Sequence, residues 1–213
     1  GSSIAQGGHQ NTYGGGSYDA FLVKFNSSGV RQWGSYYGGS DDDSGYSCAT
    51  DALGNVYLAG YTHSSSGIAS GGHQNSFGNN GFYCAYLVKF NSSGVRQWGT
   101  YYVGVNGHNR GYTCATDAAG NVYLAGRTES NIGISLGGHQ NAFGGFTDAF
   151  LVKFNASGVM QWGTYYGGSG SEIGHSCSTD AFGNVYLAGQ TSSPFGISLG
   201  GHQNAIGSNF NSD

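Results

Sequence analysis

The chain has 213 residues, of which 8% are charged, 15% are aromatic and 38% are hydrophobic. This aromatic content excludes a disordered chain, which lacks the residues needed to bury surface. The 42 glycines follow no every-third-residue rhythm, so a collagen is excluded as well. The net charge of −4 comes without any cluster of cations, so no nucleic-acid binding is expected. No apolar run approaches the roughly 20 residues of a spanning helix, so no membrane insertion is expected.

A long internal repeat organises the sequence. The segment 54–60 reads GNVYLAG and returns unchanged at 120–126 and 183–189. A period of this length indicates a repeat architecture with one structural unit per period. Three tryptophans repeat at intervals of 65 and 64 residues (98 − 33 and 162 − 98), namely Trp33, Trp98 and Trp162.

Each period contains four predicted strands. In chain order they cover residues 46–51, 55–62, 84–90 and 95–102, and short turns rich in Gly, Asn and Asp join them in pairs. The strands are apolar on both faces, whereas a sheet with one wet face alternates apolar and polar residues. Burial on both sides is typical of a sheet that lies between similar sheets, as in the blade of a β-propeller. The predicted fold is therefore all-β.

The repeated motifs resemble those of the SBBP β-propeller repeat. They are Asp-x-x-Gly-Asn-Val-Tyr-Leu-Ala-Gly, Gly-Gly-His-Gln-Asn, Asp-Ala-Phe-Leu-Val-Lys-Phe-Asn and Trp-Gly-Thr-Tyr-Tyr-Gly-Gly-Ser. The resemblance implies blades similar to NHL blades and a bacterial protein that is secreted or displayed on the cell surface. It implies no catalytic residues and no cofactor.

By analogy with NHL blades, the four strands of a blade are named A to D, and residues 1–213 form a single propeller array. The array holds about three blades of four antiparallel strands, and one of them is split between the two ends of the chain. The expected parts are strands C and D of the split blade at 19–37, complete blades at 46–103 and 112–166, and strands A and B of the split blade at 175–191. The loops with the GGHQN motif fall at 7–16, 71–81, 137–145 and 200–207.

Three blades are fewer than the four to eight that close a propeller. The sequence leaves two ways to complete the ring. Two chains can form a six-bladed homo-oligomer in which each chain supplies strands A and B to the other's C and D. Alternatively, the remainder of a larger propeller supplies the missing blades.

The sharpest polar signal is the His-Gln-Asn triplet in each long loop. Imidazole and amide groups beside aromatic residues suit sugar hydroxyls, so a glycan is one candidate ligand. The other interpretation is that these side chains bond the backbone of their own loops. No metal site is expected, because the histidines lie one to a blade. The candidate residues are His9, Gln10, Asn11, His73, Gln74, Asn75, His139, Gln140, Asn141, His202, Gln203 and Asn204.

The four cysteines do not form the pattern of a disulfide framework. Cys48, Cys114 and Cys177 occupy equivalent positions in successive repeats, and such residues are seldom within the 7 Å or so that a bridge requires. We expect them to be small buried hydrophobes.

No catalytic motif of the Gly-x-Ser-x-Gly or His-Glu-x-x-His type occurs, so an enzyme is not expected. The sequence predicts a non-catalytic extracellular binding or adhesion module, lectin-like in binding glycans through its loop face. The alternative is a structural module that assembles with itself to close or extend a propeller ring.

Overall fold

The structure is a computed structural model that describes residues 4–78 and 81–205. These residues form twelve strands and no helix, which confirms the all-β class. No described segment is a helix that could span a lipid bilayer. The strands are β1 (Ala20–Phe25), β2 (Arg31–Tyr37), β3 (Asp43–Thr50), β4 (Val56–Thr62), β5 (Cys84–Phe90), β6 (Arg96–Tyr102), β7 (Asn109–Thr116), β8 (Val122–Thr128), β9 (Asp148–Phe154), β10 (Met160–Tyr166), β11 (Glu172–Thr179) and β12 (Val185–Thr191).

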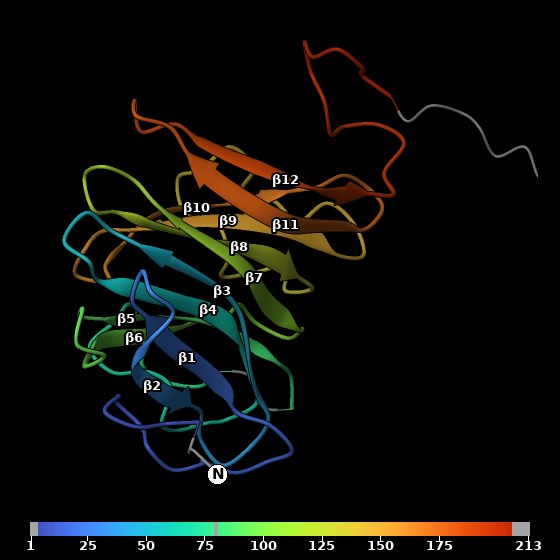
Figure 1. Cartoon of the computed structure of the whole chain (residues 1–213). Helices are drawn as coiled ribbons and strands as arrows, with labels where there is room; N and C mark the ends of the chain where they lie inside the picture. Colours follow the sequence, from blue (N-terminus) through green and yellow to red (C-terminus); the bar gives the residue numbers. More distant parts are fainter. Residues whose placement is uncertain (1–3, 79–80, 206–213) are drawn as a thin grey trace, which may run out of the picture.

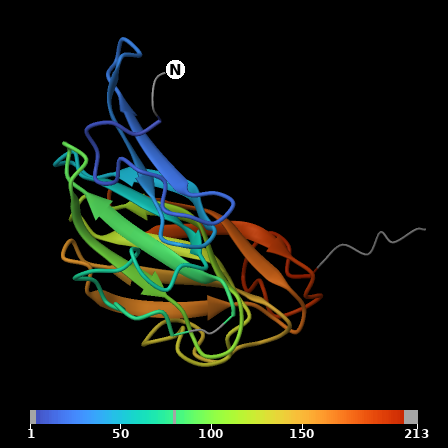
Figure 2. The ribbon, with the colours of Figure 1, turned by 90° about the horizontal axis from the view of Figure 1, so that it is seen from below.

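Two complete four-stranded antiparallel blades lie in the middle of the molecule, with strand orders β3-β4-β5-β6 and β10-β9-β8-β7. The two-stranded sheets β1-β2 and β11-β12 lie at opposite ends of this stack (Figure 1). Seen from below, the complete blades still separate the two hairpins (Figure 2). The propeller-type blades predicted from the sequence are therefore confirmed, and the two end hairpins lie where the halves of the predicted split blade were expected.

The first strand of each blade begins earlier than the sequence indicated. β3 starts at Asp43 rather than at residue 46, because Asp43 pairs with Thr62 in the sheet. The Asp43 carboxylate is buried and accepts hydrogen bonds from Ser64 Oγ at 2.8 Å and from Gly39 N at 2.7 Å. A polar residue can extend the strand here because the adjoining loop supplies its partners.

A carboxylate folds the turn between the first two strands of each blade. Asp51 Oδ1 accepts the N–H groups of Leu53 and Asn55 at 3.0 and 2.9 Å. Gly54 adopts a φ of 76°, which a residue with a side chain rarely accepts. The same contacts recur at Asp117, so the recurring aspartates are turn residues, as the sequence indicated.

The first strands of successive blades lie beside one another and are joined by hydroxyl groups. Thr116 Oγ1 in β7 donates to Thr50 O in β3 at 2.7 Å, and Thr179 Oγ1 in β11 donates to Thr116 O at 2.7 Å. Ser47 Oγ accepts the N–H of Cys114 at 3.2 Å. The same kind of hydroxyl hydrogen bond therefore connects the first strand of each of these sheets to the first strand of the next.

A tryptophan on the last strand of each blade makes a second connection. Trp33 Nε1 donates to Ser92 O at 3.1 Å, in the turn between β5 and β6 of the next blade. Its indole ring lies against Gly94 of that turn, where an added Cβ would sit 2.9 Å from the ring. Trp98 repeats this contact one blade further on, with Ala156 O at 3.0 Å.

Apolar residues on both faces of the blades fill the space between them, and every residue of β5 is buried.

Replacing Gly94 with alanine tests this contact against a matched position. Gly94 and Gly120 both have a φ of 80°, but the nearest neighbour of a Cβ at Gly120 is Ala156 Cβ at 3.9 Å. We expect Gly120→Ala to lower the free energy of unfolding by about 1–2 kcal/mol, the cost of left-handed backbone for a residue with Cβ. Gly94→Ala should lose more, because its methyl group also meets Trp33. Urea unfolding measures both losses, and equal losses would show that the indole contact carries no energy.

Candidate assembly interface

The two complete blades show what the strands of a split blade lack. In them, the second strand pairs with the third along its length, for example Tyr57 with Lys89 and Tyr123 with Lys153. β12 is the equivalent second strand and β1 the equivalent third strand, yet each is paired on one edge only within the described residues. A strand with an unpaired edge presents N–H and C=O groups to a further strand.

Side chains that are buried in the complete blades are exposed on β1 and β12. Phe90 and Phe154 have 0% exposure, while the equivalent Phe25 is 59% exposed. Tyr57 is also fully buried, while its equivalent Tyr186 is 56% exposed. Fully burying one such side chain stabilises by about 1.5–3 kcal/mol. The two open edges therefore carry apolar surface of the kind that the complete blades bury.

The two open edges are also complementary in charge. Within the complete blades, Lys89 lies 3.9 Å from Asp51, and Lys153 lies 3.6 Å from Asp117. In the split blade the equivalent residues are Lys24 on β1 and Asp180 before β12, at opposite ends of the molecule. Among the described residues no ion pair joins Asp180 to a cation.

The series of tryptophan contacts stops at β10. Trp33 and Trp98 each donate to the turn of the next blade, and Lys24 and Lys89 donate to the same two carbonyl groups at 3.0 and 3.1 Å. In the described part of the chain, Trp162 has no turn of a following blade to which its indole N–H group can donate. The equivalent turn is the one between β1 and β2, where a Cβ at Gly29 would have nothing within 4 Å.

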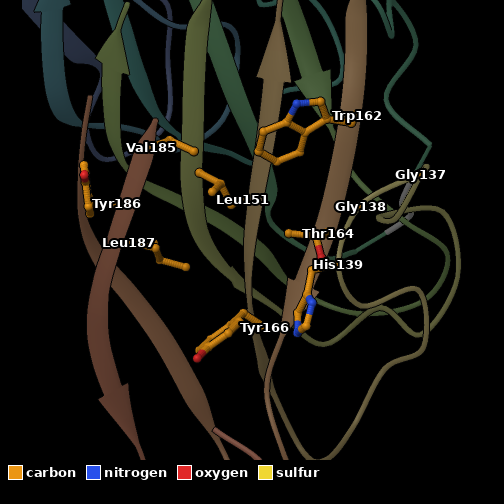
Figure 3. A pocket seen from close by; sticks show the side chains of 10 residues that line it. All are labelled: Gly137, Gly138, His139, Leu151, Trp162, Thr164, Tyr166, Val185, Tyr186 and Leu187. Atoms are coloured by element: carbon orange, nitrogen blue, oxygen red, sulfur yellow. The ribbon is translucent and has the colours of Figure 1, made fainter. Parts of the chain in front are cut away.

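A groove of about 690 Å³ lies beside the β12 edge. Leu151, Trp162 and Tyr166 line it from blade β7–β10, and Tyr186 and Leu187 line it from β12 (Figure 3). In the complete blades the equivalent surface is filled by aromatic residues of the next third strand. Tyr102, for example, packs on Phe150 and Phe154 at centroid distances of 5.2 and 5.9 Å.

A second groove of about 510 Å³ lies between β1 and β3, lined by Phe21, Phe25, Tyr46 and Cys48 among others. The sequence predicted that Cys48 is buried, and this prediction is wrong: Cys48 is exposed, whereas Cys114 and Cys177 are buried. The difference has a structural cause, because the first strand of the preceding blade covers Cys114 and Cys177 and no strand covers Cys48.

The His-Gln-Asn triplets occupy four separate loops. The glutamine amides bond their surroundings: Gln140 Oε1 accepts Gly167 N at 3.0 Å, and Gln10 and Gln74 accept the equivalent N–H groups. Asn75 and Asn141 donate to glycine carbonyls of their own loops. Asn11, Asn204 and the amide of Gln203 lie exposed, and Gln203 Nε2 donates to Ala205 O at 2.7 Å. The end of the last loop, residues 206–207, lies outside the described residues, as do residues 79–80 of the second loop.

The histidines of the triplets lie on the surface and face the next blade. His9 packs on Phe90 at a centroid distance of 6.2 Å, and His73 packs on Phe154 at 6.1 Å. His139 lines the groove beside β12, and His202 is exposed at the end of the array. The four histidines are not brought together, and no group of three metal-ligating side chains occurs within the described ranges. A ligand role for the triplets stays a prediction.

Two buried acids, Asp148 of β9 and Glu172 of β11, lie where the half-blade β11-β12 meets the blade before it. Asp148 is fully buried with one oxygen, Oδ1, lacking a hydrogen bond, and Glu172 is 2% exposed. Both carboxylates lie near Gly167, at 2.4 and 2.7 Å from the position that its Cβ would take. Burial raises the pKa of Asp148, and the nearby charge of Glu172 adds to this. Burial also opposes the charge of Glu172, but hydrogen bonds from Thr191 and other donors lower its pKa overall.

Sequence reasoning predicted a two-stranded half-blade at each end of the array but not the residues of their open edges. Phe25, Lys24 and Asp180 have the same identities as their buried or paired counterparts in other repeats, so no local signal marks them. The signal is positional: each belongs to a half-blade whose complement lies at the other end of the chain.

These sheets, their stacking and their repeated contacts define a β-propeller array. Residues 32–67 and 161–196 both match the beta-propeller repeat family SBBP. These two segments of the chain are therefore similar to SBBP beta-propeller repeats. Each matched segment runs from the last strand of one blade through the first two strands of the next. No curated protein matches the chain. Beta-propeller repeats of this kind suggest a protein-interaction module.

Replacing Asp148 with asparagine should stabilise the protein at neutral pH. A carboxyl group with a raised folded pKa contributes fully below its unfolded pKa, and the contribution is lost as pH rises through the folded pKa. An asparagine amide carries no charge and can donate to Glu172, so we expect a gain of about 1 kcal/mol at pH 7. The gain should shrink below about pH 4, where the wild-type carboxyl group is itself protonated. Urea unfolding across this pH range measures it.

Asp117→Asn is the matched control with the opposite sign. Burial raises the pKa of Asp117, but hydrogen bonds from Asn121 and other donors outweigh it, so the pKa is lowered. Its stabilising contribution is present above the unfolded pKa and is lost as pH falls through the folded pKa. Asp117→Asn should therefore destabilise at pH 7 by about 1–2 kcal/mol. A loss of stability in both variants at pH 7 would contradict the account of Asp148.

Proposed function

We propose that this chain is a non-catalytic, self-assembling propeller module in which two copies complete each other's split blade. The observation that supports this is the pair of open edges. In a complete blade the second strand pairs with the third strand. β12 has the side chains of a second strand and β1 has those of a third strand, so the open edge of each could pair with the other strand from a second copy. The proposed place of action is outside the cell, on the strength of the resemblance to SBBP proteins.

The register of the new pairing follows from the complete blades. There, Val56 pairs with Phe90 and Val122 with Phe154, and the ladder runs on antiparallel. The equivalent pairing places Val185 of one chain opposite Phe25 of the partner subunit. In the same register Lys24 of the partner subunit reaches Asp180, as Lys89 reaches Asp51 in a complete blade.

The neighbouring contacts extend in the same way. Trp162 Nε1 would donate to Ser27 O of the partner subunit and lie on the partner's Gly29. Tyr101 and Tyr165 donate to Ser64 O and Ser130 O within their own blades, at 2.9 and 3.0 Å. Tyr36 would donate likewise to Ser193 O of the partner subunit. Each contact that ends at an open edge thus acquires its counterpart from the second copy.

Two copies give a ring of plausible size. Each chain holds two complete blades and two halves of a third, so two chains hold six blades, within the four to eight of closed propellers. One chain would hold three and three chains would hold nine, both outside this range. A closed ring also removes the exposed strand edges.

Glycan binding through the His-Gln-Asn loops is the weaker alternative. The amides of Gln10, Gln74 and Gln140 already bond backbone groups, which favours the structural interpretation of the triplets. The assembly proposal is instead supported by residues whose counterparts are all paired or buried.

The mass of the native particle tests the assembly proposal. We expect twice the mass of the chain in analytical ultracentrifugation. Lys24→Asp and Asp180→Lys should each weaken the dimer, because each puts like charges together at both junctions of the ring. Mixing the two variants should restore it, since in the mixed dimer one junction carries a swapped pair and the other a native pair.

The mixing experiment separates loss of assembly from loss of folding. A misfolded variant would not be rescued by another variant, while circular dichroism checks that each one alone keeps its β-structure. A monomer at every concentration tested, or a mixture that fails to associate, would rule out the two-chain ring.

Cys48 offers an independent probe of the same interface. Cys48 is exposed in the single chain, while burial raises the pKa of the Cys84 and Cys114 thiols to about 12. In the ring, β11 of the partner subunit would cover Cys48 as β3 covers Cys114 within one chain. We expect a thiol reagent to label one cysteine per chain in dilute solution and none in the assembled protein. Labelling of Cys48 that is independent of protein concentration would contradict the proposal.

A further inference from the structure

A cluster of aromatic and basic side chains lies between blade β3–β6 and strand β7. Arg110 lies between two tyrosine rings, with its guanidinium carbon 5.2 Å from the centroid of Tyr61 and 4.8 Å from that of Tyr83. Tyr46 stacks on Tyr61 at 5.2 Å, and their hydroxyl groups are 3.1 Å apart. His63 stacks on Tyr83 at 3.8 Å.

Arg110 differs from the other cations of the described chain in lacking a polar partner. Each of the other six arginine and lysine side chains makes an ion pair or a hydrogen bond, whereas Arg110 has only its tyrosine rings. The Nε atom of Arg110 is buried without a hydrogen bond, as is that of Arg127 opposite it, but Arg127 has Glu129 as a partner. A buried N–H donor without an acceptor costs free energy that an incoming acceptor would recover.

The sheet register adds a second cation. Arg110 in β7 lies directly opposite Arg127 in β8. Like charges opposed in this way destabilise a sheet. Arg127 has Glu129 at 3.4 Å as its counter-ion, so one positive charge of the pair remains without a carboxylate. An anion beside Arg110 would balance it.

The residues of this cluster depart from the repeat. The positions equivalent to Arg110 hold Ser44 and Ile173, and those equivalent to Tyr61 hold Arg127 and Gln190. The difference is confined to these positions, because the flanking glycine, cysteine and threonine positions of the strands are kept in all three copies. Arg110 of blade β7–β10 thus lies between two aromatic rings of blade β3–β6, and the equivalent positions of the other repeats do not provide this arrangement.

We propose that Arg110 and the surrounding tyrosines form a binding site for a sugar ring that carries a carboxylate. The guanidinium fork matches a carboxylate in shape and donates two parallel hydrogen bonds to it. Arg110 and the stacked Tyr46 and His63 cover the rings of Tyr61 and Tyr83. Tyr46 itself is 53% exposed, so the sugar would pack its C–H face on Tyr46 while its carboxylate meets Arg110. Every residue of the site lies within the described part of one chain, so the site does not depend on ring closure.

Three probes separate the parts of this chemistry. Glucuronate has the ring and the charge, glucose has the ring alone, and acetate has the charge alone. We expect glucuronate to shift the Arg110 Nε–H signal in an NMR titration and to bind at least about tenfold more tightly than either partial probe. Glucuronate that binds no more tightly than acetate would overturn the sugar assignment, and absence of any shift at Arg110 would overturn the site.

Arg110→Gln is the decisive variant, with Arg96→Gln as its matched control. Arg96 lies on the outer strand β6 and donates to Gly67 O at 3.0 Å, so its loss removes the same charge away from the site. We expect Arg110→Gln to weaken glucuronate binding by about tenfold or more and Arg96→Gln to leave it unchanged. If Arg110→Gln lowers only the unfolding temperature while glucuronate still binds as tightly, the arginine is a packing residue and the proposal is wrong.

A single chain contains every residue of the Arg110 site. Glucuronate binding can therefore be tested separately from dimer formation. Glucuronate binding is measured in a variant that stays monomeric, such as Asp180→Lys, as well as in the wild-type protein. Equal binding by both is expected, and loss of binding in the monomeric variant would contradict the claim that the site lies within one chain.

Discussion

The contact between a tryptophan and the following turn sets the geometry of this protein. The Trp33 N–H group bonds Ser92 O, and its ring lies on Gly94, a residue that the turn needs for its positive φ. The residues that form the turn between β5 and β6 therefore also form the surface on which Trp33 packs. A substitution in this turn would affect both its backbone conformation and its contact with Trp33. Because the contact runs from each blade to the next, it gives the array a direction and leaves Trp162 at the end of the series.

That direction explains why the two ends of the molecule are complementary rather than alike. The apolar faces of each strand must be covered on both sides, since the chain has few charged residues to keep a face in water. The complete blades cover each other, and their Phe90 and Phe154 are fully buried. At the ends the same residue type becomes the exposed Phe25. The half-blade at one end lacks what the other half-blade provides.

The sequence predicted the blades well because their causes are local. Strands buried on both faces appear as continuous apolar runs, and Asp51 with Gly54 marks a turn through groups only a few residues apart. The exposure of Cys48 could not be predicted in this way, because its burial depends on a strand of another blade. The glutamines of the long loops were ambiguous for a related reason, since their partners are main-chain atoms that a sequence does not display. Phe25 and Phe90 are the same residue type at equivalent positions, but one is exposed and the other is buried.

Identity between repeats and departure from it therefore carry different information. A residue that packs between blades recurs, because every blade meets the next in the same way, as Trp33 and Trp98 do. A residue that serves one ligand need not recur, and a change at such a position leaves the other blades intact. Under the proposal made above, Arg110 is a departure of this second kind; its buried Nε–H group and the opposed charge of Arg127 both lie in blade β7–β10. In a nearly uniform array, the exceptional positions are where individual recognition can evolve without loosening the ring.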